Sequence, residues 1–345
     1  MRVNRVSSQM SKTIIILSLS KIVAAFTPLA TTSTFPTSSL WSAREEELQP
    51  LSNKDDHLVS VLSGNGEVLV RAITARELVQ EALVKQDLRP VAADALGRVM
   101  ICTLLMSQGL KDKETLQLTF SGSGPLKSVM AISDGEGGVR GFVGNGREEL
   151  TTTNVGEAIG AGLLQVVRNH PDFERPYNGI VQLRNGQVAY DVAGYLKDSE
   201  QKSCAIAAGV TVTGALCRQA SGYYIETLPG ASDETMNRIT ANVARVLAQS
   251  KDPAQLMADG LTPTALVEVL LEGVGGINSL TMSKPKYVCH CSSERVFRAL
   301  RLLGEEEVKQ IVASNEMVEV KCEFCGKCYR MQVRSCPAPF ILSDN

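Results

Sequence analysis

The sequence is poor in aromatic residues and carries almost no net charge. Aromatic side chains make up 5% of its 345 residues while 44% are hydrophobic, so the expected core is sizeable but mostly aliphatic. The formal net charge is −2, which gives neither a basic field for nucleic acid nor an acidic tail. The apolar run at residues 14–19 is far too short to span a bilayer. We therefore expect neither nucleic acid nor a membrane among the partners of this protein.

Recognisable catalytic arrangements are missing as well. The large domain shows no Ser/His/Asp arrangement, no paired-carboxylate site and no nucleotide-binding loop. The glycine-dense stretch at residues 135–146 has neither Walker nor dinucleotide spacing, and no Lys-Ser/Thr pair follows its glycines. Turns between short strands explain these glycines. We predict that the protein is not an enzyme.

Cysteine is unevenly distributed along the chain. Six of the nine cysteines lie in the last sixty residues. The total of nine is an odd number, and the clustering argues against a secreted disulfide scaffold and favours metal or redox chemistry in a reducing compartment. Cys102, Cys204 and Cys217 lie in apolar helix and strand contexts, and we interpret them as small buried hydrophobic residues.

Four of the clustered cysteines form two close pairs. One residue separates Cys289 from Cys291, two separate Cys322 from Cys325, and thirty residues lie between the pairs. A tetrahedral zinc ion requires two such pairs joined by a short folded insert, since each pair holds one edge of the tetrahedron. Gly326 directly follows the second pair and suits a tight knuckle. The spacing predicts a zinc site, although a single intervening residue in the first pair is unusual.

The cysteine pairs lie in a distinctive sequence context. Its parts are residues 287–295, residues 305–308, residues 322–326 with Tyr329, and, upstream, residues 138–144 and 194–201. Together with the cysteines, these stretches resemble the 33 kDa chaperonin (heat-shock protein 33) family of redox-regulated chaperones. The resemblance covers roughly residues 55–335.

The resemblance implies a holdase chaperone that the cysteines control. In the reduced, inactive form Cys289, Cys291, Cys322 and Cys325 hold Zn²⁺ as thiolates, the form that peroxide or hypochlorous acid attacks. The family pattern implies two disulfides, Cys289–Cys291 and Cys322–Cys325, whose formation releases zinc and unfolds the switch and the linker before it. The exposed surface then binds unfolding or misfolding client proteins and prevents their aggregation, and the oxidised form is a homodimer.

Three further residues near the pairs leave alternatives open. Cys328 forms a second CxxC with Cys325, so it is a possible auxiliary thiol that could replace a ligand or divert a disulfide. The match of Cys322-x-x-Cys325-Gly to the family favours Cys325 as the ligand. His290 could compete as a ligand, but four cysteines already complete the site. Cys336 is not part of the four-ligand motif.

Composition and pattern divide the chain into four parts. They are a targeting leader at residues 1–45, an N-terminal α+β domain at 55–229, a helical linker at 230–286 and a small zinc-binding redox-switch domain at 287–345. Strands and helices in the large domain come in mixed order without strict alternation, which favours the α+β class. The linker helices are short, amphipathic and marginal alone. An ordinary helical subdomain and a switch element fit them equally well, and the resemblance favours a metastable clamp on the N-terminal domain.

Local patterns predict particular elements. Residues 58–62 and 67–72 flank a glycine turn and predict a hairpin. Alternation at residues 179–192 predicts a strand, and residues 191–200 predict a helix. Ser232 is the predicted N-cap of a helix ending near residue 249. Residues 317–322 and 329–333 predict two strands paired across the cysteine knuckle.

The leader has the composition of a targeting segment. No acidic residue precedes Glu45, and the short apolar run at residues 14–19 is followed by a small-residue stretch at 23–25 and by a Ser/Thr-rich stretch at 27–39. A signal peptide followed by a transit-like stretch resembles the bipartite leaders of plastids surrounded by extra membranes. We expect the mature protein in the plastid (chloroplast) stroma. The alternatives are secretion and a cytoplasmic location.

Two other function classes fit the cysteine pairs. A zinc ribbon that binds nucleic acid would need basic and aromatic residues around the knuckle, and Glu319 and residues 305–307 offset the basic residues present there. A thiol oxidoreductase would place its CxxC at a helix N-terminus on a βαβ scaffold, whereas Cys322 and Cys325 lie between two predicted strands.

Overall fold

The structure is a computed structural model that describes residues 2–6, 14–16, 55–250, 252–301 and 317–332. Two compact units make up the chain. The larger unit is Ser20–Val288, and the smaller one combines Cys289–Asn345 with Met1–Leu19. Within the described residues the fold mixes helices with mostly antiparallel sheets, so the predicted α+β class is confirmed.

The larger unit contains two sheets. The five-stranded sheet has the order β10-β11-β4-β3-β12, and the six-stranded sheet has the order β13-β7-β6-β5-β8-β9. The first comprises β3 (Leu58–Ser63), β4 (Val68–Thr74), β10 (Ser203–Thr213), β11 (Leu216–Thr227) and β12 (Ile277–Ser283). The second comprises β5 (Thr115–Gly122), β6 (Ser128–Asp134), β7 (Gly138–Val143), β8 (Gly162–Asn169), β9 (Tyr177–Gln182) and β13 (Lys286–Tyr287).

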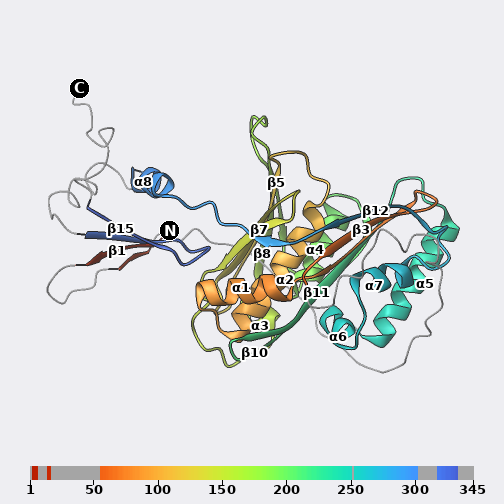
Figure 1. Cartoon of the computed structure of the whole chain (residues 1–345), viewed down its shortest axis with the longest axis horizontal. Coiled ribbons are helices and arrows are strands. Elements are labelled where there is room, and N and C mark those ends of the chain that lie inside the picture. The colour runs from red at the N-terminus through yellow and green to blue at the C-terminus, as the bar shows by residue number, and fades with distance from the viewer. Residues whose placement is uncertain (1, 7–13, 17–54, 251, 302–316, 333–345) are drawn as a thin grey trace. The chain divides into compact units, whose positions relative to one another are not determined.

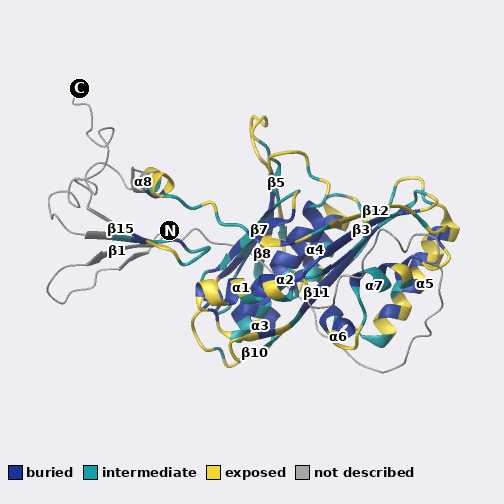
Figure 2. Ribbon diagram, viewed as in Figure 1, coloured by how far each residue is buried: buried dark blue, intermediate teal, exposed yellow. Residues whose placement is uncertain are grey.

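Helix α2 (Pro90–Ser107) forms the centre of this unit. It packs against β6 of one sheet and β10 of the other. Pro90 at its first turn has a backbone suited to helix initiation. Among the described residues, α2 alone is long and apolar enough to cross a membrane, but 78% of it is buried in the fold. Its composition is therefore explained by its place in the core, dark blue in Figure 2. The neighbouring helices are α1 (Arg76–Gln86), α3 (Val155–Ile159) and α4 (Val188–Asp198).

Three linker helices cover one face of the five-stranded sheet. They are α5 (Asp233–Gln249), α6 (Pro253–Ala258) and α7 (Pro263–Leu270), and Figure 1 shows them beside β3 and β11. The Ser232 hydroxyl accepts a hydrogen bond from the Thr235 amide, so the predicted N-cap is confirmed. The helices bury an apolar stripe that joins strand residues in one cluster: Val59, Val61, Val68, Val70, Ala72, Tyr223, Ile225, Ile239, Val246, Leu256, Met257, Leu266, Val267, Leu270, Leu271 and Val274. Each valine, leucine, isoleucine or methionine side chain of this kind contributes about 1.5–3 kcal/mol when fully buried.

The structure corrects two local predictions in this unit. The predicted strand at residues 179–192 is wrong in its second half, because β9 ends at Gln182 and α4 begins at Val188. Gly186, with φ of 91°, turns the chain between them. The predicted helical linker also ends in a strand, β12, which pairs with β3. The predicted hairpin of β3 and β4 is confirmed.

The smaller unit contains a short sheet and one described helix. The sheet order is β15-β14-β1-β2, with β1 (Arg2–Val6), β2 (Ile14–Ile16), β14 (Met317–Lys321) and β15 (Cys328–Gln332). Helix α8 spans Ser293–Arg301. The predicted pairing across the knuckle is confirmed, since β14 and β15 are antiparallel neighbours. The sequence predicts no folded segment in the leader, but the structure has a strand there. β1 pairs antiparallel with the edge of β14, from Arg2 opposite Lys321 to Val6 opposite Met317.

Candidate metal centre

The first cysteine pair lies in the short connection that leads into α8. Ser292 follows Cys291 directly, and its hydroxyl accepts a hydrogen bond from the Arg295 amide. Its carbonyl also accepts from the Val296 amide at 3.0 Å. Serine in this position caps the helix and satisfies its first amides. The cap fixes the direction of the chain immediately after Cys289 and Cys291.

The second pair is held by the turn between β14 and β15. The Cys322 amide donates to the Lys327 carbonyl at 2.9 Å, and the Gly326 amide donates to the Cys322 carbonyl at 2.8 Å. Gly326 has φ of 73°, a left-handed conformation that glycine adopts without steric cost. These bonds close a tight knuckle that keeps Cys322 and Cys325 on one side of the turn.

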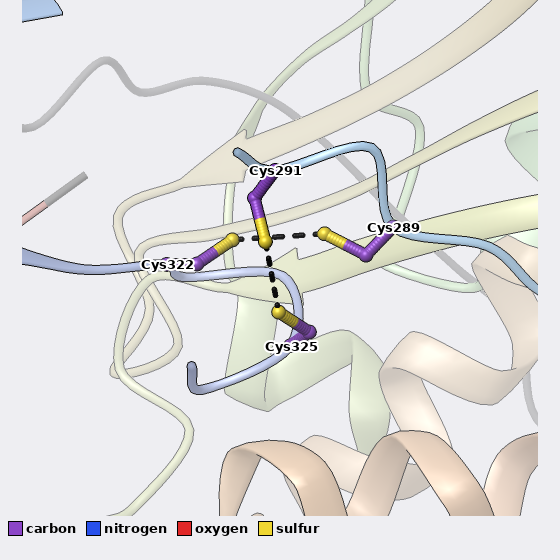
Figure 3. Close-up of side chains that lie close together, drawn as sticks. All are labelled: Cys289, Cys291, Cys322 and Cys325. Carbon is purple, nitrogen blue, oxygen red and sulfur yellow. Dashed lines mark hydrogen bonds between the residues drawn. The ribbon is translucent and has the colours of Figure 1, made fainter. Parts of the chain in front are cut away.

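The four sulfurs meet in a single cluster (Figure 3). All four Sγ atoms lie within 4.8 Å of one another. The Cys289 and Cys322 sulfurs are 3.7 Å apart, and those of Cys291 and Cys325 are 3.4 Å apart. A zinc ion bound to sulfur at about 2.3 Å in a tetrahedron has S···S edges of about 3.8 Å. The four thiols are free and the donor set fits zinc.

The surroundings affect the four thiols unequally. Burial raises the pKa of the Cys289 and Cys322 thiols. At Cys291 burial also raises the pKa, but hydrogen bonds from Tyr329 and the neighbouring sulfurs outweigh this effect, so the pKa is lowered. The Tyr329 hydroxyl donates to the Cys291 sulfur at 3.1 Å. Since Tyr329 lies on β15, this bond joins the two arms of the cluster.

The sequence reasoning found the four sulfurs but assigned no role to Tyr329. The signals in the sequence are its place four residues after Cys325, at the start of a predicted strand, and its presence in the stretch that resembles the family. The Lys327 ammonium lies 5.1 Å from the centre of the Tyr329 ring, a cation–π contact that helps to orient the ring. Tyr329 therefore donates a hydrogen bond to one of the candidate ligand sulfurs, as the partners of metal ligands commonly do.

The remaining cysteines lie outside the cluster or outside the described residues. Cys328 is exposed and its sulfur contacts the Gly326 carbonyl at 3.7 Å. Among the described residues the ligand group contains neither Cys328 nor His290. Cys336 lies outside the described residues. Burial raises the pKa of the Cys102 and Cys217 thiols to about 12, which makes them poor nucleophiles. Cys204 is partly buried, and its pKa is raised to about 11.

The arrangement bears on the oxidoreductase alternative. Cys322 and Cys325 lie in a β-turn between β14 and β15 rather than at a helix N-terminus. A helix N-terminus is what lowers the pKa of a catalytic CxxC thiol. At Cys322 the pKa is raised instead, mainly by burial. The site is suited to holding a metal rather than to catalysing thiol exchange.

Comparisons with known proteins point in one direction. A profile of the family described as "Hsp33 protein" matches residues 56–332. The 33 kDa chaperonin of Symbiobacterium thermophilum is 35% identical over 283 residues, which cover 80% of this chain and 94% of that protein. The 33 kDa chaperonin of Agathobacter rectalis is 30% identical over 285 residues, covering 81% and 97%.

A solved structure extends the comparison to the fold. The crystal structure of the 33 kDa chaperonin (heat shock protein 33 homolog) from Thermotoga maritima has a TM-score of 0.73 and 27% identity, over 81% of this chain and 95% of that chain. These relatives are named as chaperonins rather than enzymes. Their names give no support to a nucleic-acid-binding zinc ribbon.

Proposed function

The chain belongs to the Hsp33 family, and on this basis we propose that it is a redox-regulated holdase chaperone switched by its cysteine cluster. The observation that carries the proposal is the convergence of four sulfurs within 4.8 Å. Cys289, Cys291, Cys322 and Cys325 are the proposed zinc ligands, and the reduced, zinc-bound protein is the inactive form.

Zinc would supply folding free energy to the smaller unit. Structural zinc sites contribute about 10–16 kcal/mol of apparent binding free energy at neutral pH. A unit with so small a core draws much of its stability from such a site. The two cysteine arms would hold the sulfurs in place, the Tyr329 hydrogen bond would stabilise the Cys291 thiolate, and bound zinc would keep all four sulfurs deprotonated.

Oxidation of the cysteines would remove this support. Two thiols and one peroxide give one disulfide and two waters, so forming both disulfides consumes about two peroxides per chain. In the cluster every sulfur lies near every other, so the distances do not select one disulfide pairing. We therefore propose the pairs Cys289–Cys291 and Cys322–Cys325 from the family resemblance. Once both disulfides have formed, no thiolate set remains to hold zinc, and the smaller unit unfolds.

Tyr287 is the residue of the larger unit through which unfolding of the smaller unit would reach the linker. Its hydroxyl donates to the Gly141 carbonyl at 2.9 Å and accepts from the Gln86 amide group at 3.0 Å. The Val288 amide donates to the Val139 carbonyl at 2.8 Å. Cys289 follows at once, so unfolding that begins there reaches Tyr287 along the chain.

Release of β12 and helices α5–α7 would then expose the client-binding surface. These helices are short and depend on their packing against the sheet. Their detachment uncovers the apolar faces of β3 and β4 and the apolar stripes of the helices themselves. Such surface binds unfolding or misfolding proteins. We further propose that the oxidised protein is a homodimer.

The test is suppression of aggregation. A heat-labile enzyme is warmed with either reduced, zinc-loaded protein or protein oxidised with peroxide at the same concentration. We expect the oxidised form to keep the client soluble and the reduced form to do so poorly. Equal suppression by both forms would rule out a redox switch.

We also propose a plastid location for the mature protein. The family match begins at residue 56, so the leader precedes the part of the chain that matches the family. A full-length fluorescent fusion should accumulate in the plastid, and N-terminal sequencing of the mature protein should start after the leader. A fusion retained in the cytoplasm or secreted, with its first residues intact, would contradict this.

A further inference from the structure

The segment from Ile277 to Tyr287 forms an edge strand in both sheets of the larger unit. β12 closes one edge of the five-stranded sheet by pairing with β3, and β13 closes one edge of the six-stranded sheet by pairing with β7. Figure 1 shows β12 running alongside β3. Both strands belong to this segment, and Cys289 lies two residues after its end. Its release therefore uncovers sheet edges as well as apolar faces.

β12 is held mainly through its backbone. The side chains of Asn278, Ser279, Thr281 and Met282 are exposed, and those of Ile277, Leu280 and Ser283 are only partly buried. No residue of β12 is fully buried, in contrast to Tyr287 of β13, which is 8% exposed. Ile277 and Leu280 pack against the cluster under the linker helices, but the backbone groups at the edge of β3 can pair with a strand of any sequence.

The backbone groups that face β12 can be identified. The Thr74 amide donates to the His57 carbonyl at 2.9 Å, which directs the groups of His57 toward β4. The Gly64 amide donates to the Gly276 carbonyl at 2.7 Å, which directs Gly64 toward the linker. Since backbone groups alternate along a strand, Ser60 and Leu62 present theirs to β12. Ser60 pairs with Thr281 and Leu62 with Ser279.

We propose that the vacated edge of β3 binds an extended segment of the client as an added strand in place of β12. The proposal rests on the proposed function, because β12 must first be released. Main-chain hydrogen bonds to Ser60 and Leu62 give affinity without sequence specificity, as in other strand-addition complexes. The ligand is therefore an extended stretch of unfolded polypeptide.

The adjacent apolar face selects among such stretches. In the resting protein Leu280 and Met282 of β12 pair with Val61 and Val59, whose side chains lie in the cluster under the linker helices. A client strand in the same place directs every second side chain to this face. Segments with apolar residues at alternate positions, which are buried in native proteins and exposed on unfolding, fit both the edge and the face.

Two proline substitutions break the same rung from opposite strands. Thr281→Pro removes the amide that β12 offers to Ser60, and Ser60→Pro removes the amide that β3 offers to either β12 or a client. Proline is tolerated on an edge strand where its missing amide faces away from the rest of the sheet. Both substitutions loosen β12, but only Ser60→Pro damages the proposed binding edge.

The two variants should therefore behave in opposite ways. In reduced Thr281→Pro protein we expect the fraction of molecules whose β12 is detached to rise about 5–30-fold. Binding of unfolded, carboxymethylated α-lactalbumin by the reduced protein should rise by the same factor. We expect oxidised Ser60→Pro protein to bind the same client about tenfold more weakly than the oxidised parent. Ser60→Pro protein that binds as tightly as the parent would overturn the proposal and leave the redox switch intact.

Hydrogen exchange on the unsubstituted chain gives an independent test. The amides of Ser60, Leu62 and Gly64 should be protected in the reduced protein, exchange in the oxidised protein, and become protected again with carboxymethylated α-lactalbumin. Two outcomes would overturn strand addition but not holdase activity. In one, the three amides still exchange when client is bound; in the other, they stay protected after oxidation although client binds. Reprotection that depends on protein concentration without client would show a second copy at the edge and overturn the proposal. Oxidised protein that binds no client would overturn the proposed function itself.

Discussion

Tyr329 connects the cysteine arms at the scale of single residues. Its hydroxyl donates to the Cys291 sulfur, while the residue itself follows the knuckle that carries Cys322 and Cys325. Hydrogen bonds made to a ligating side chain are worth about 10–100-fold in metal affinity. We predict that Tyr329→Phe lowers the affinity for zinc about tenfold in a chelator competition titration. The matched control is Arg330→Gln, which loses an exposed ion pair with Glu319 and should bind zinc as the parent does. Equal affinities in all three proteins would contradict the assigned role.

Cys325 and Cys328 lie three residues apart but differ in their position relative to the cluster and in their exposure. Cys325 contributes one of the four clustered sulfurs, whereas Cys328 is exposed and lies outside the group. We predict that Cys325→Ser abolishes stoichiometric zinc binding and that Cys328→Ser keeps one zinc per chain and the redox response. Metal analysis of both purified variants checks this. Loss of zinc from Cys328→Ser would show that the ligand set is not the one proposed.

Asp191 gives the larger unit a pH dependence. One of its carboxylate oxygens accepts from the Arg184 amide at 2.7 Å, and the other is buried without a hydrogen-bond partner in the structure. Burial raises the pKa of Asp191 to about 7 from an ordinary value near 3.8. A raised carboxyl pKa means that the folded state favours the proton. Its stabilising effect is complete below pH 3.8 and is lost as the pH rises through about 7.

The corresponding variant is Asp191→Asn, which keeps an oxygen for the Arg184 amide but cannot ionise. We predict that its urea midpoint rises relative to the parent, with a gap that grows from pH 5 to about pH 7 and levels off toward pH 8. A gap that is constant across this range would show that Asp191 titrates at its ordinary pKa.

Residue identity and spacing predict part of the centre. The four sulfurs were predicted because metal ligands must occur in close pairs. The Tyr329 bond and the unpaired Asp191 oxygen were not predictable, because both depend on contacts between segments far apart in the sequence.

At the scale of elements, the turn of the first hairpin lies directly against the linker. A Cβ atom added at Gly64 would lie 1.9 Å from the Gly275 carbonyl oxygen, just before β12. We predict that Gly64→Ala dislodges β12 and raises client binding by the reduced protein about 5–30-fold. Gly66→Ala is the control, since it lies in the same turn with φ of +73° but its Cβ meets nothing within 4 Å. If both variants bind client equally, turn strain rather than linker contact is responsible.

Elements with strong periodicity were predictable, and elements defined by pairing were not. α2 and α5 follow the spacing of their apolar residues, and the first hairpin follows its glycine turn. β12 carries mostly polar, exposed side chains, so it leaves no alternating signal and exists because β3 offers an edge. In α4 the alternation of Val188, Tyr190 and Val192 matched a strand by chance, while Val188, Val192 and Tyr195 form the buried helical stripe.

At the scale of the whole molecule, the two compact units have different sources of stability. The larger unit has two sheets around α2 and a second core beneath the linker. Without the leader strands β1 and β2, the described part of the smaller unit has the hairpin of β14 and β15, one helix and the cysteine cluster. The proposed coupling of these units rests on family membership, whereas the spacing of the cysteine pairs predicted only the metal site within the smaller unit.

The central claim is that one metal ion, bound by four thiolates, keeps the linker closed. The most direct measurement follows zinc content, free thiols and client binding together while the reduced protein is titrated with peroxide. The account predicts one zinc per chain at the start, loss of zinc in step with loss of four thiols, and client binding that appears over the same interval. Reduced protein without zinc, or zinc that stays bound after the four thiols are oxidised, would contradict it.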